Sequence, residues 1–246
     1  MSVDEAPERL VNLRREQVHP NRRPVDAATL VLIDPSGRKP RVLLGLRHAR
    51  QKFVPAKFVF PGGRVDPADR RMPVYGALDA ESERRLEARV VRPSLSRSRA
   101  LALAAIRETF EETGLLLGTR EAGSPPLALP PGWEGFGAAG VFPNLEALRF
   151  VARAITPPRL VRRFDTRFFM ADVRDVAHEV KGVVGPDSEL TELRWLTLEE
   201  AKAADILTIT RNILGEVEQR LAPGGYRRPV PFYYMRGGAF RCDTLD

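Results

Sequence analysis

The sequence predicts an α/β fold in which a mixed β-sheet is flanked by helices. Short apolar runs bounded by turn residues indicate strands, and longer segments with apolar residues at helical spacing indicate helices. One aromatic strand, Phe58–Phe60, ends in the turn Pro61–Gly63, and a helix with one acidic and one apolar face follows around Arg107–Leu115. A chain of 246 residues with 43% hydrophobic content can bury the core of one elaborated domain.

The first elements form a hairpin behind a polar segment. Residues 1–25 are charged and punctuated by proline, which predicts an N-terminal arm. Residues 27–33 then predict a strand, 34–37 have strong turn chemistry, and 42–46 predict the return strand. Arg47 begins the basic loop that follows, where a guanidinium could contact phosphate, although solubility alone would also explain a basic surface loop.

The next segment, about residues 70–100, connects the glycine turn to the acidic helix. Within it, residues 81–91 read as a charged helix that Pro93 ends. The acidic helix should end at Gly114 in a left-handed cap, and residues 115–117 predict a short strand directly after it. Three serines are candidate N-caps for the acidic helix: Ser94, Ser96 and Ser98.

The second half of the chain begins with a long loop. Residues 119–146 are rich in Gly and Pro, and their Trp133 and Phe136 could either anchor the loop or stack on a base. Residues 148–155 and 166–173 predict two further strands. The turn between these strands contains three arginines that are candidates for contacts with substrate phosphate: Arg159, Arg162 and Arg163.

The last elements are a strand, two helices and a tail. Residues 187–201 predict a strand that ends at Leu196 and a helix capped by Thr197. Residues 206–221 predict an amphipathic terminal helix. The aromatic and basic tail, 222–246, is expected to pack on the domain or on a partner subunit, so a homodimer is one expectation.

The acidic face of the helix around Arg107–Leu115 carries the chemistry. Glu108, Glu111 and Glu112 fall within about a third of the helix circumference. Like charges at this spacing each cost a few tenths of a kcal/mol on a bare helix. The face is therefore either fully solvated or a site for a hard cation such as Mg²⁺, which takes oxygen ligands and leaves positions open for phosphates.

The glycine turn and the acidic helix together resemble the signature of the Nudix hydrolases: Gly, five residues, Glu, seven residues, Arg-Glu, an apolar residue, any residue, Glu-Glu, any residue, Gly and an apolar residue. Thr109 holds the apolar place, Asp69 stands where the family has Glu, and about thirty extra residues precede Arg107. The insertion, together with FVPAKFVFPGG and RFDTRFF, is similar to the branch of peroxisomal-type coenzyme A diphosphatases and their bacterial relatives. The residues that match the signature are Gly63, Arg107, Glu108, Glu111, Glu112, Gly114 and Leu115.

The resemblance implies a Nudix-type α/β/α sandwich over residues 26–221, with an insertion within the box and a C-terminal helix. It implies hydrolysis of a nucleoside diphosphate linked to another group, with Mg²⁺ or Mn²⁺ as cofactor. The favoured substrate is coenzyme A or acyl-CoA. The alternatives are ADP-ribose, dinucleotides or nucleoside triphosphates, or a catalytically weak Nudix protein that senses a ligand.

The resemblance also implies roles for single residues. The carbonyl of Gly63 and the carboxylates of Glu108, Glu111 and Glu112 would hold the metal. Arg107 would orient the glutamates. Asp69 would support the helix through Arg107, while the general base or an extra ligand remains open among Glu108, Glu189 and Glu192.

Net charge and composition limit the classes of binding partner that we expect. The formal net charge of +7 and the pI near 10 favour anionic partners. No zinc knuckle, recognition helix or aromatic RNA-binding motif is evident, so a nucleic-acid partner is not expected. The single Cys242 suits a reducing compartment, and neither a signal peptide nor a membrane span is evident. We therefore expect a cytoplasmic protein with a small-molecule substrate and no membrane partner.

Overall fold

The computed structural model describes residues 18–246 except 52, 124 and 127. The helices are α2 (Ala80–Glu87), α3 (Leu95–Thr113), α4 (Glu134–Ala139), α5 (Leu198–Ala203) and α6 (Thr208–Leu221), with 3₁₀ turns η2 (Pro67–Arg71), η3 (Val173–Asp175) and η4 (Gly225–Arg227). The strands are β1 (Val25–Asp34), β2 (Arg41–Arg47), β3 (Phe58–Val59), β4 (Gly62–Arg64), β5 (Leu115–Thr119), β6 (Phe142–Pro143), β7 (Arg149–Ile155), β8 (Phe164–Asp172), β9 (Val176–Glu179), β10 (Leu190–Thr197), β11 (Val230–Arg236) and β12 (Ala239–Leu245). Each strand and helix expected in the domain is present, most with shifted ends.

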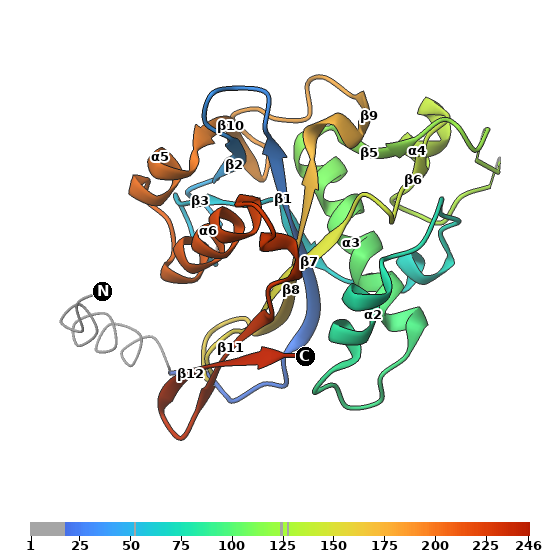
Figure 1. Cartoon of the computed structure of the whole chain (residues 1–246). Coiled ribbons are helices and arrows are strands. Elements are labelled where there is room, and N and C mark those ends of the chain that lie inside the picture. The colour runs from blue at the N-terminus through green and yellow to red at the C-terminus, as the bar shows by residue number, and fades with distance from the viewer. Residues whose placement is uncertain (1–17, 52, 124, 127) are drawn as a thin grey trace.

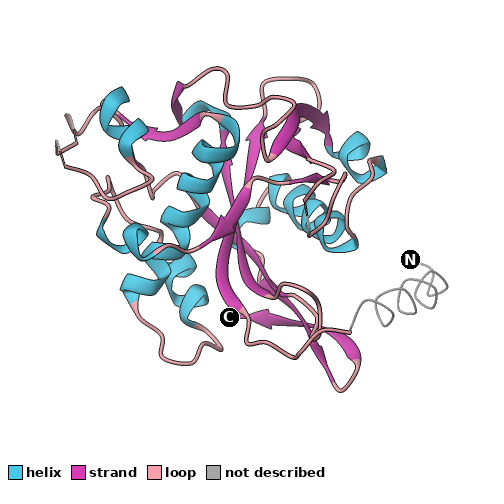
Figure 2. Ribbon diagram, turned by 180° about the vertical axis from the view of Figure 1, so that it is seen from behind, coloured by secondary structure: helices cyan, strands magenta, loops and turns pink. Residues whose placement is uncertain are grey.

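The main sheet is mixed and nine-stranded, in the order β10-β2-β1-β8-β7-β11-β12, with β3 paired to β2 and β4 paired to β1. β1 runs parallel to β8 and antiparallel to β2 and β4. Helices α2 and α3 lie on one side of the sheet and α5 and α6 on the other (Figures 1 and 2). This arrangement confirms the predicted α/β/α sandwich.

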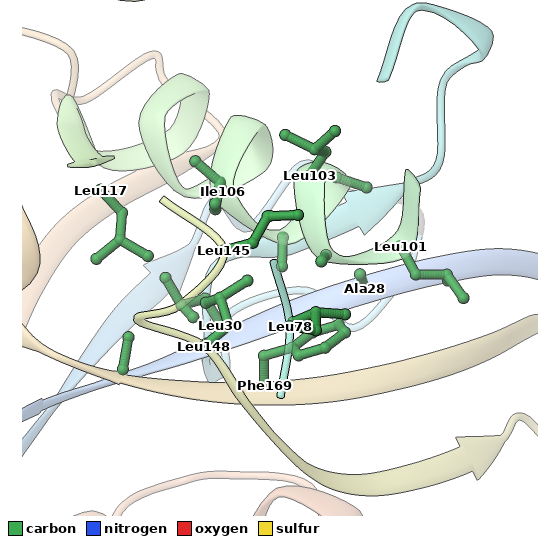
Figure 3. Packing of buried hydrophobic residues seen from close by; sticks show 14 of the residues in the cluster. Ala28, Leu30, Leu78, Leu101, Leu103, Ile106, Leu117, Leu145, Leu148 and Phe169 are labelled. Carbon is green, nitrogen blue, oxygen red and sulfur yellow. The ribbon is translucent and has the colours of Figure 1, made fainter. Parts of the chain in front are cut away.

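Two apolar cores separate the layers because alternate residues of each strand face opposite sides of the sheet. Ala28 and Leu30 of β1 pack with Ile106 of α3 in one core (Figure 3). Val31 of β1 packs with Ile213 of α6 in the other. The central strand β1 is thereby covered on both faces, and α3 is fixed across the strand that also carries β4.

The ends of α3 follow the sequence. Ser94 is the N-cap among the three candidate serines, and its side chain accepts the N–H of Arg97 at 3.3 Å. Gly114 ends the helix with a φ of 79°. In contrast, α2 ends at Glu87, about one turn before the predicted end, and Arg89 adopts a left-handed φ of 54°.

Two segments contain more regular structure than the sequence predicted, and the tail packs on the domain as expected. The loop 119–146 contains α4 and β6, and the tail 222–246 forms the hairpin β11–β12, which extends the main sheet beyond β7. Of the predicted arm, residues 1–17 lie outside the described part. Among the described residues, no helix is both long enough and apolar enough to cross a membrane.

Candidate active site

The glycine turn lies against the acidic helix. β4 pairs with β1, and the N–H of Gly62 donates to Glu112 Oε2 at 3.0 Å across a separation of 50 residues. A Cβ at Gly63 would lie 2.3 Å from Glu108 Oε2, and a Cβ at Gly62 would lie 2.5 Å from the carbonyl oxygen of Ala28. Glycine is therefore required at position 62, where a side chain would meet the backbone of β1, whereas a side chain at position 63 would displace the carboxylate of Glu108.

Arg107 joins the two parts of the site. Its Nε and Nη2 donate to Asp69 Oδ1 and Oδ2 at 2.8 and 3.2 Å, and Nη2 also donates to the carbonyl of Arg64 at 2.9 Å. Its Nη1 lies 2.8 Å from Glu111 Oε2 and 3.0 Å from Glu108 Oε1. The guanidinium thus contacts the β4 backbone, the η2 turn and two glutamates of α3, and it fixes their relative positions.

Asp69 fills the place of the longer family glutamate. It is fully buried, and besides binding Arg107 it accepts the N–H of Asp66 at 2.8 Å. Asp66 in turn accepts the N–H of Ala68, so the two aspartates form a capping box on η2. This turn holds the shorter side chain close enough to reach the guanidinium.

Burial dominates the electrostatics of the glutamates. It raises the pKa of Glu108 to about 7, against the lowering influence of the Arg107 charge. Burial also raises the pKa of Glu112 to about 8; the Gly62 N–H opposes this, and the negative charges of Glu189 and Glu108 add to it. The pKa of Glu111 is raised by burial too, against the influence of Arg107. The neighbouring positive charges and N–H groups therefore do not fully compensate the negative charge of the three glutamates.

The residues fit a hard divalent cation in their chemistry. Glu108 and Glu112 offer carboxylate oxygens beside the carbonyl of Gly63, and Mg²⁺ is commonly held by one or two carboxylates, with waters and substrate phosphates completing its shell. Within the described ranges, no group of three or more His, Cys, Asp or Glu side chains is gathered as a ready ligand set. Glu111 instead pairs with Arg107.

A second ion pair flanks Glu112. Arg47 Nη2 lies 2.9 Å from Glu189 Oε1, and the side chain of Arg47 is only 12% exposed. The Nε of Arg47 is buried and has no hydrogen-bond partner among the described residues. Both charges act on the pKa of Glu112. The structure therefore brings these two predicted residues to the acidic helix.

Glu192 lies on the other face of the sheet. Along β10, Leu193 and Trp195 pack in the core beneath α3, whereas Leu196 packs in the core beneath α6. Since side chains alternate along a strand, Glu192 faces away from the box glutamates. It pairs with Arg194, with Nε 2.5 Å from Oε1. The structure does not support its expected role as base or ligand, because the strand period sets it opposite the site.

The three arginines of the β7–β8 turn are also separate from the box. Arg163 donates from Nη1 to Asn21 Oδ1 and to the Arg22 carbonyl, both at 3.0 Å, and so holds the segment that leads into β1. Arg159 and Arg162 are exposed. Among the described residues, no hydrogen bond or ion pair joins any of the three to a box side chain. The number of arginines in a turn does not indicate whether the turn lies close to the site in the folded chain.

The sequence did not predict that the long loop contacts the site. A Cβ at Gly132 would lie 3.0 Å from Glu111 Oε1 and 3.1 Å from Arg107 Cδ. The neighbouring Trp133 and Phe136 are completely buried, with ring centroids 5.0 Å apart. Both aromatics therefore anchor the loop and are not free to stack on a base. The only signal for this contact was the turn chemistry of the residues before Trp133.

No model of a known protein family matches the sequence. Among solved structures, a Nudix hydrolase from Alicyclobacillus acidocaldarius is similar over 84% of this chain and 96% of its own, with 25% sequence identity and a TM-score of 0.59. The Nudix domain of NrtR from Shewanella oneidensis, solved with ADP-ribose, is 12% identical over 82% of this chain and 90% of its own, with a TM-score of 0.44. An Ap4A hydrolase from C. elegans is 17% identical over 81% and 98%, with a TM-score of 0.43.

The last two likenesses are too distant to bear on the substrate. The first, together with the strand order and the arrangement of the box, shows the fold of the Nudix hydrolases and supports an enzyme, a hydrolase of the Nudix type.

Proposed function

We propose that this chain is a Nudix hydrolase that uses Mg²⁺ or Mn²⁺ to cleave the pyrophosphate bond of a nucleoside diphosphate linked to another group. The observation that carries the proposal is the contact of the Gly62–Gly63 turn with Glu108 and Glu112. The backbone turn meets the buried carboxylate of Glu112 and the largely buried carboxylate of Glu108, although 50 residues separate Gly62 from Glu112. A chain of net charge +7 also suits an anionic substrate.

The proposed metal ligands are the carbonyl of Gly63 and the carboxylates of Glu108, Glu111 and Glu112. A bound divalent ion supplies charge stabilisation for the phosphate oxygens and lowers the pKa of a water. Arg107 orients the glutamates and does not touch the substrate, because Asp69, Arg64, Glu108 and Glu111 occupy its N–H groups.

Two residues remain as candidates for the general base. Glu108 is one, because its carboxylate lies against the Gly63 turn, where a bound metal would hold the attacking water. Glu189 lies beside Glu112 but is held by Arg47. Arg47 itself is proposed as a phosphate contact, since its buried Nε lacks a partner and guanidinium groups bind phosphate in charge-assisted pairs.

Coenzyme A or acyl-CoA is the proposed substrate, on the basis of the insertion within the box and the segments FVPAKFVFPGG and RFDTRFF. ADP-ribose, dinucleotides and nucleoside triphosphates are the competing substrates. A catalytically weak Nudix protein that senses a ligand is the other alternative, and the bidentate pair between Asp69 and Arg107 supports the enzyme over it. The free Cys242 suits work in the reducing cytoplasm.

The test is a screen of the purified full chain against these pyrophosphates with Mg²⁺, with Mn²⁺ and with chelator. We expect metal-dependent release of a nucleoside monophosphate or of phosphopantetheine. Glu112→Gln should lower kcat on the order of 100-fold, while the matched control Glu192→Gln, on the opposite face, should leave it unchanged. Full activity of Glu112→Gln would refute the metal site. Ligand binding without turnover in excess metal would replace the enzyme with a binding protein.

A further inference from the structure

The C-terminal hairpin leaves an open strand at the edge of the main sheet. β12 is the outermost strand, and no strand in the described part of the chain pairs with its outer side (Figure 1). Edge strands expose unpaired N–H and C=O groups and are commonly protected by proline, lysine or a bulge. β12 contains neither residue, and its register with β11 is uninterrupted over its whole length.

The turn of the hairpin fixes which backbone groups face outward. Gly237 and Gly238 have φ values of 59° and 78°, and Arg236 pairs with Ala239 across them. Two-residue turns of this kind close on a hydrogen-bonded pair, and bonded and non-bonded pairs then alternate. The backbone groups of Phe240, Cys242 and Thr244 therefore point away from β11.

The register supports this assignment independently. Pro231 lies opposite Thr244. Proline has no N–H to donate, so the pair Pro231–Thr244 suits a non-bonded position in the ladder. The outward row of β12 thus consists of alternate residues centred on Cys242, which is the middle residue of the strand.

We propose that two copies of this chain form a homodimer by antiparallel pairing of their β12 strands about a two-fold axis at Cys242. A two-fold axis between residues would set outward groups opposite inward ones and leave them unpaired, and an axis at Arg241 or Asp243 would pair outward groups but over a shorter overlap. Axes at Phe240 or Thr244 would shorten the overlap. The axis at Cys242 pairs Phe240 with Thr244 of the partner subunit and satisfies the whole outward row.

The side chains agree with this register. It sets Arg241 opposite Asp243 of the partner subunit, and the symmetry repeats this pairing on the other side of the axis. Asp243 already accepts the hydroxyl of Tyr234 at 2.8 Å and pairs with Arg89. An ionised carboxylate offers about four acceptor positions, so a further guanidinium can bind. Opposite charges in facing positions stabilise a strand pair.

Exposed apolar side chains lie on both faces of the sheet near this edge, with Phe240 on the α6 face and the α2–α3 connection on the α3 face. Phe240 is 49% exposed, and Val91 and Leu95, in the connection between α2 and α3, are 77% and 63% exposed. The ion pair of Arg89 with Asp243 ties this connection to β12, and both views show it beside the C-terminal end of the strand (Figures 1 and 2).

The first experiment measures the mass of the full chain by light scattering during size-exclusion chromatography. We expect twice 27.5 kDa for the natural chain and for Arg241→Lys. In Arg241→Asp the new carboxylate would face Asp243 of the partner subunit, and the dimer Kd should rise about tenfold or more. A monomer at all concentrations, or a dimer that Arg241→Asp leaves intact, would overturn the proposal.

The second experiment uses the only cysteine of the chain. In the proposed register the two Cys242 Cα atoms lie about 5.5 Å apart, within the range of a disulfide. Mild oxidation should convert the dimer into a covalent species, and neither Cys242→Ser nor Arg241→Asp should give it efficiently. Hydrogen exchange should show protected N–H groups at Phe240 and Thr244 in the dimer. Rapid exchange at both positions in a dimeric sample would assign the contact to another surface and reject this one.

Discussion

The replacement Asp69→Ala tests how the acidic helix is held in place. Asp69 is fully buried and forms two bonds to Arg107, of 2.8 and 3.2 Å. Removing one partner of a buried ion pair costs about 3–5 kcal/mol, because the remaining charge loses its compensation. Arg107 keeps Glu108, Glu111 and the Arg64 carbonyl, so we expect the lower end, about 3 kcal/mol.

For a domain of this size, about 3 kcal/mol corresponds to a fall in Tm of roughly 6–12 °C. The measurement is thermal unfolding of the full chain, and metal-dependent hydrolysis should fall with it, because Arg107 no longer fixes α3 relative to β4. Asp66→Ala is the matched control. It removes the N-cap of the same turn but no bond to Arg107, so it should cost only about 1 kcal/mol. Equal Tm values for Asp69→Ala and Asp66→Ala would refute the reasoning.

Two further predictions concern the same site. Gly63→Ala places a Cβ 2.3 Å from Glu108 Oε2, so it should displace that carboxylate and abolish metal-dependent activity while costing little stability, because the end of the glutamate side chain can move. Gly215→Ala, with open space at its Cβ, should leave activity unchanged and be neutral or slightly stabilising. An active Gly63→Ala would contradict the close contact. The second prediction is that the stability of the metal-free protein decreases as the pH rises from 4.5 through 7 and 8. The raised pKa values of Glu108 and Glu112 mean that the folded state binds more protons than the unfolded state in this window. Urea titrations at a series of pH values measure this trend, and a free energy of unfolding that rises with pH across the window would contradict it.

The sequence predicted those parts of the molecule that are set by local chemistry. Ser94 and Gly114 bound α3 because a hydroxyl cap and a left-handed glycine act within a few residues. Thr197 caps α5 with Glu200 for the same reason. The glycine turn and the glutamates were recognised from their spacing as a signature, and the structure brings Gly63 against Glu108.

The errors arose where placement depends on distant parts of the chain. Glu189 and Glu192 were equally plausible candidates in the sequence. In the structure Glu189 pairs with Arg47 near the site, whereas Glu192 faces the other side of the sheet. The contact of Gly132 with Glu111 likewise depends on how a long loop returns to α3.

The insertion explains why the site keeps its geometry despite a long interruption. Asp69 and Arg107 are 38 residues apart, whereas the family signature separates its acid and arginine by eight. Loop-closure entropy grows only with the logarithm of length, so this lengthening costs about 1.4 kcal/mol.

The chain is fixed at both ends of the insertion. At one end Asp69 binds Arg107, and at the other Arg97 binds Asp26 through Nε and Nη2, both at 2.7 Å. Between these two points α2 packs on β7, away from the box, and Phe150 donates its N–H to Ser82 at 3.2 Å. The residues between the two fixed points can therefore vary to form other surfaces without moving Gly63 relative to the glutamates.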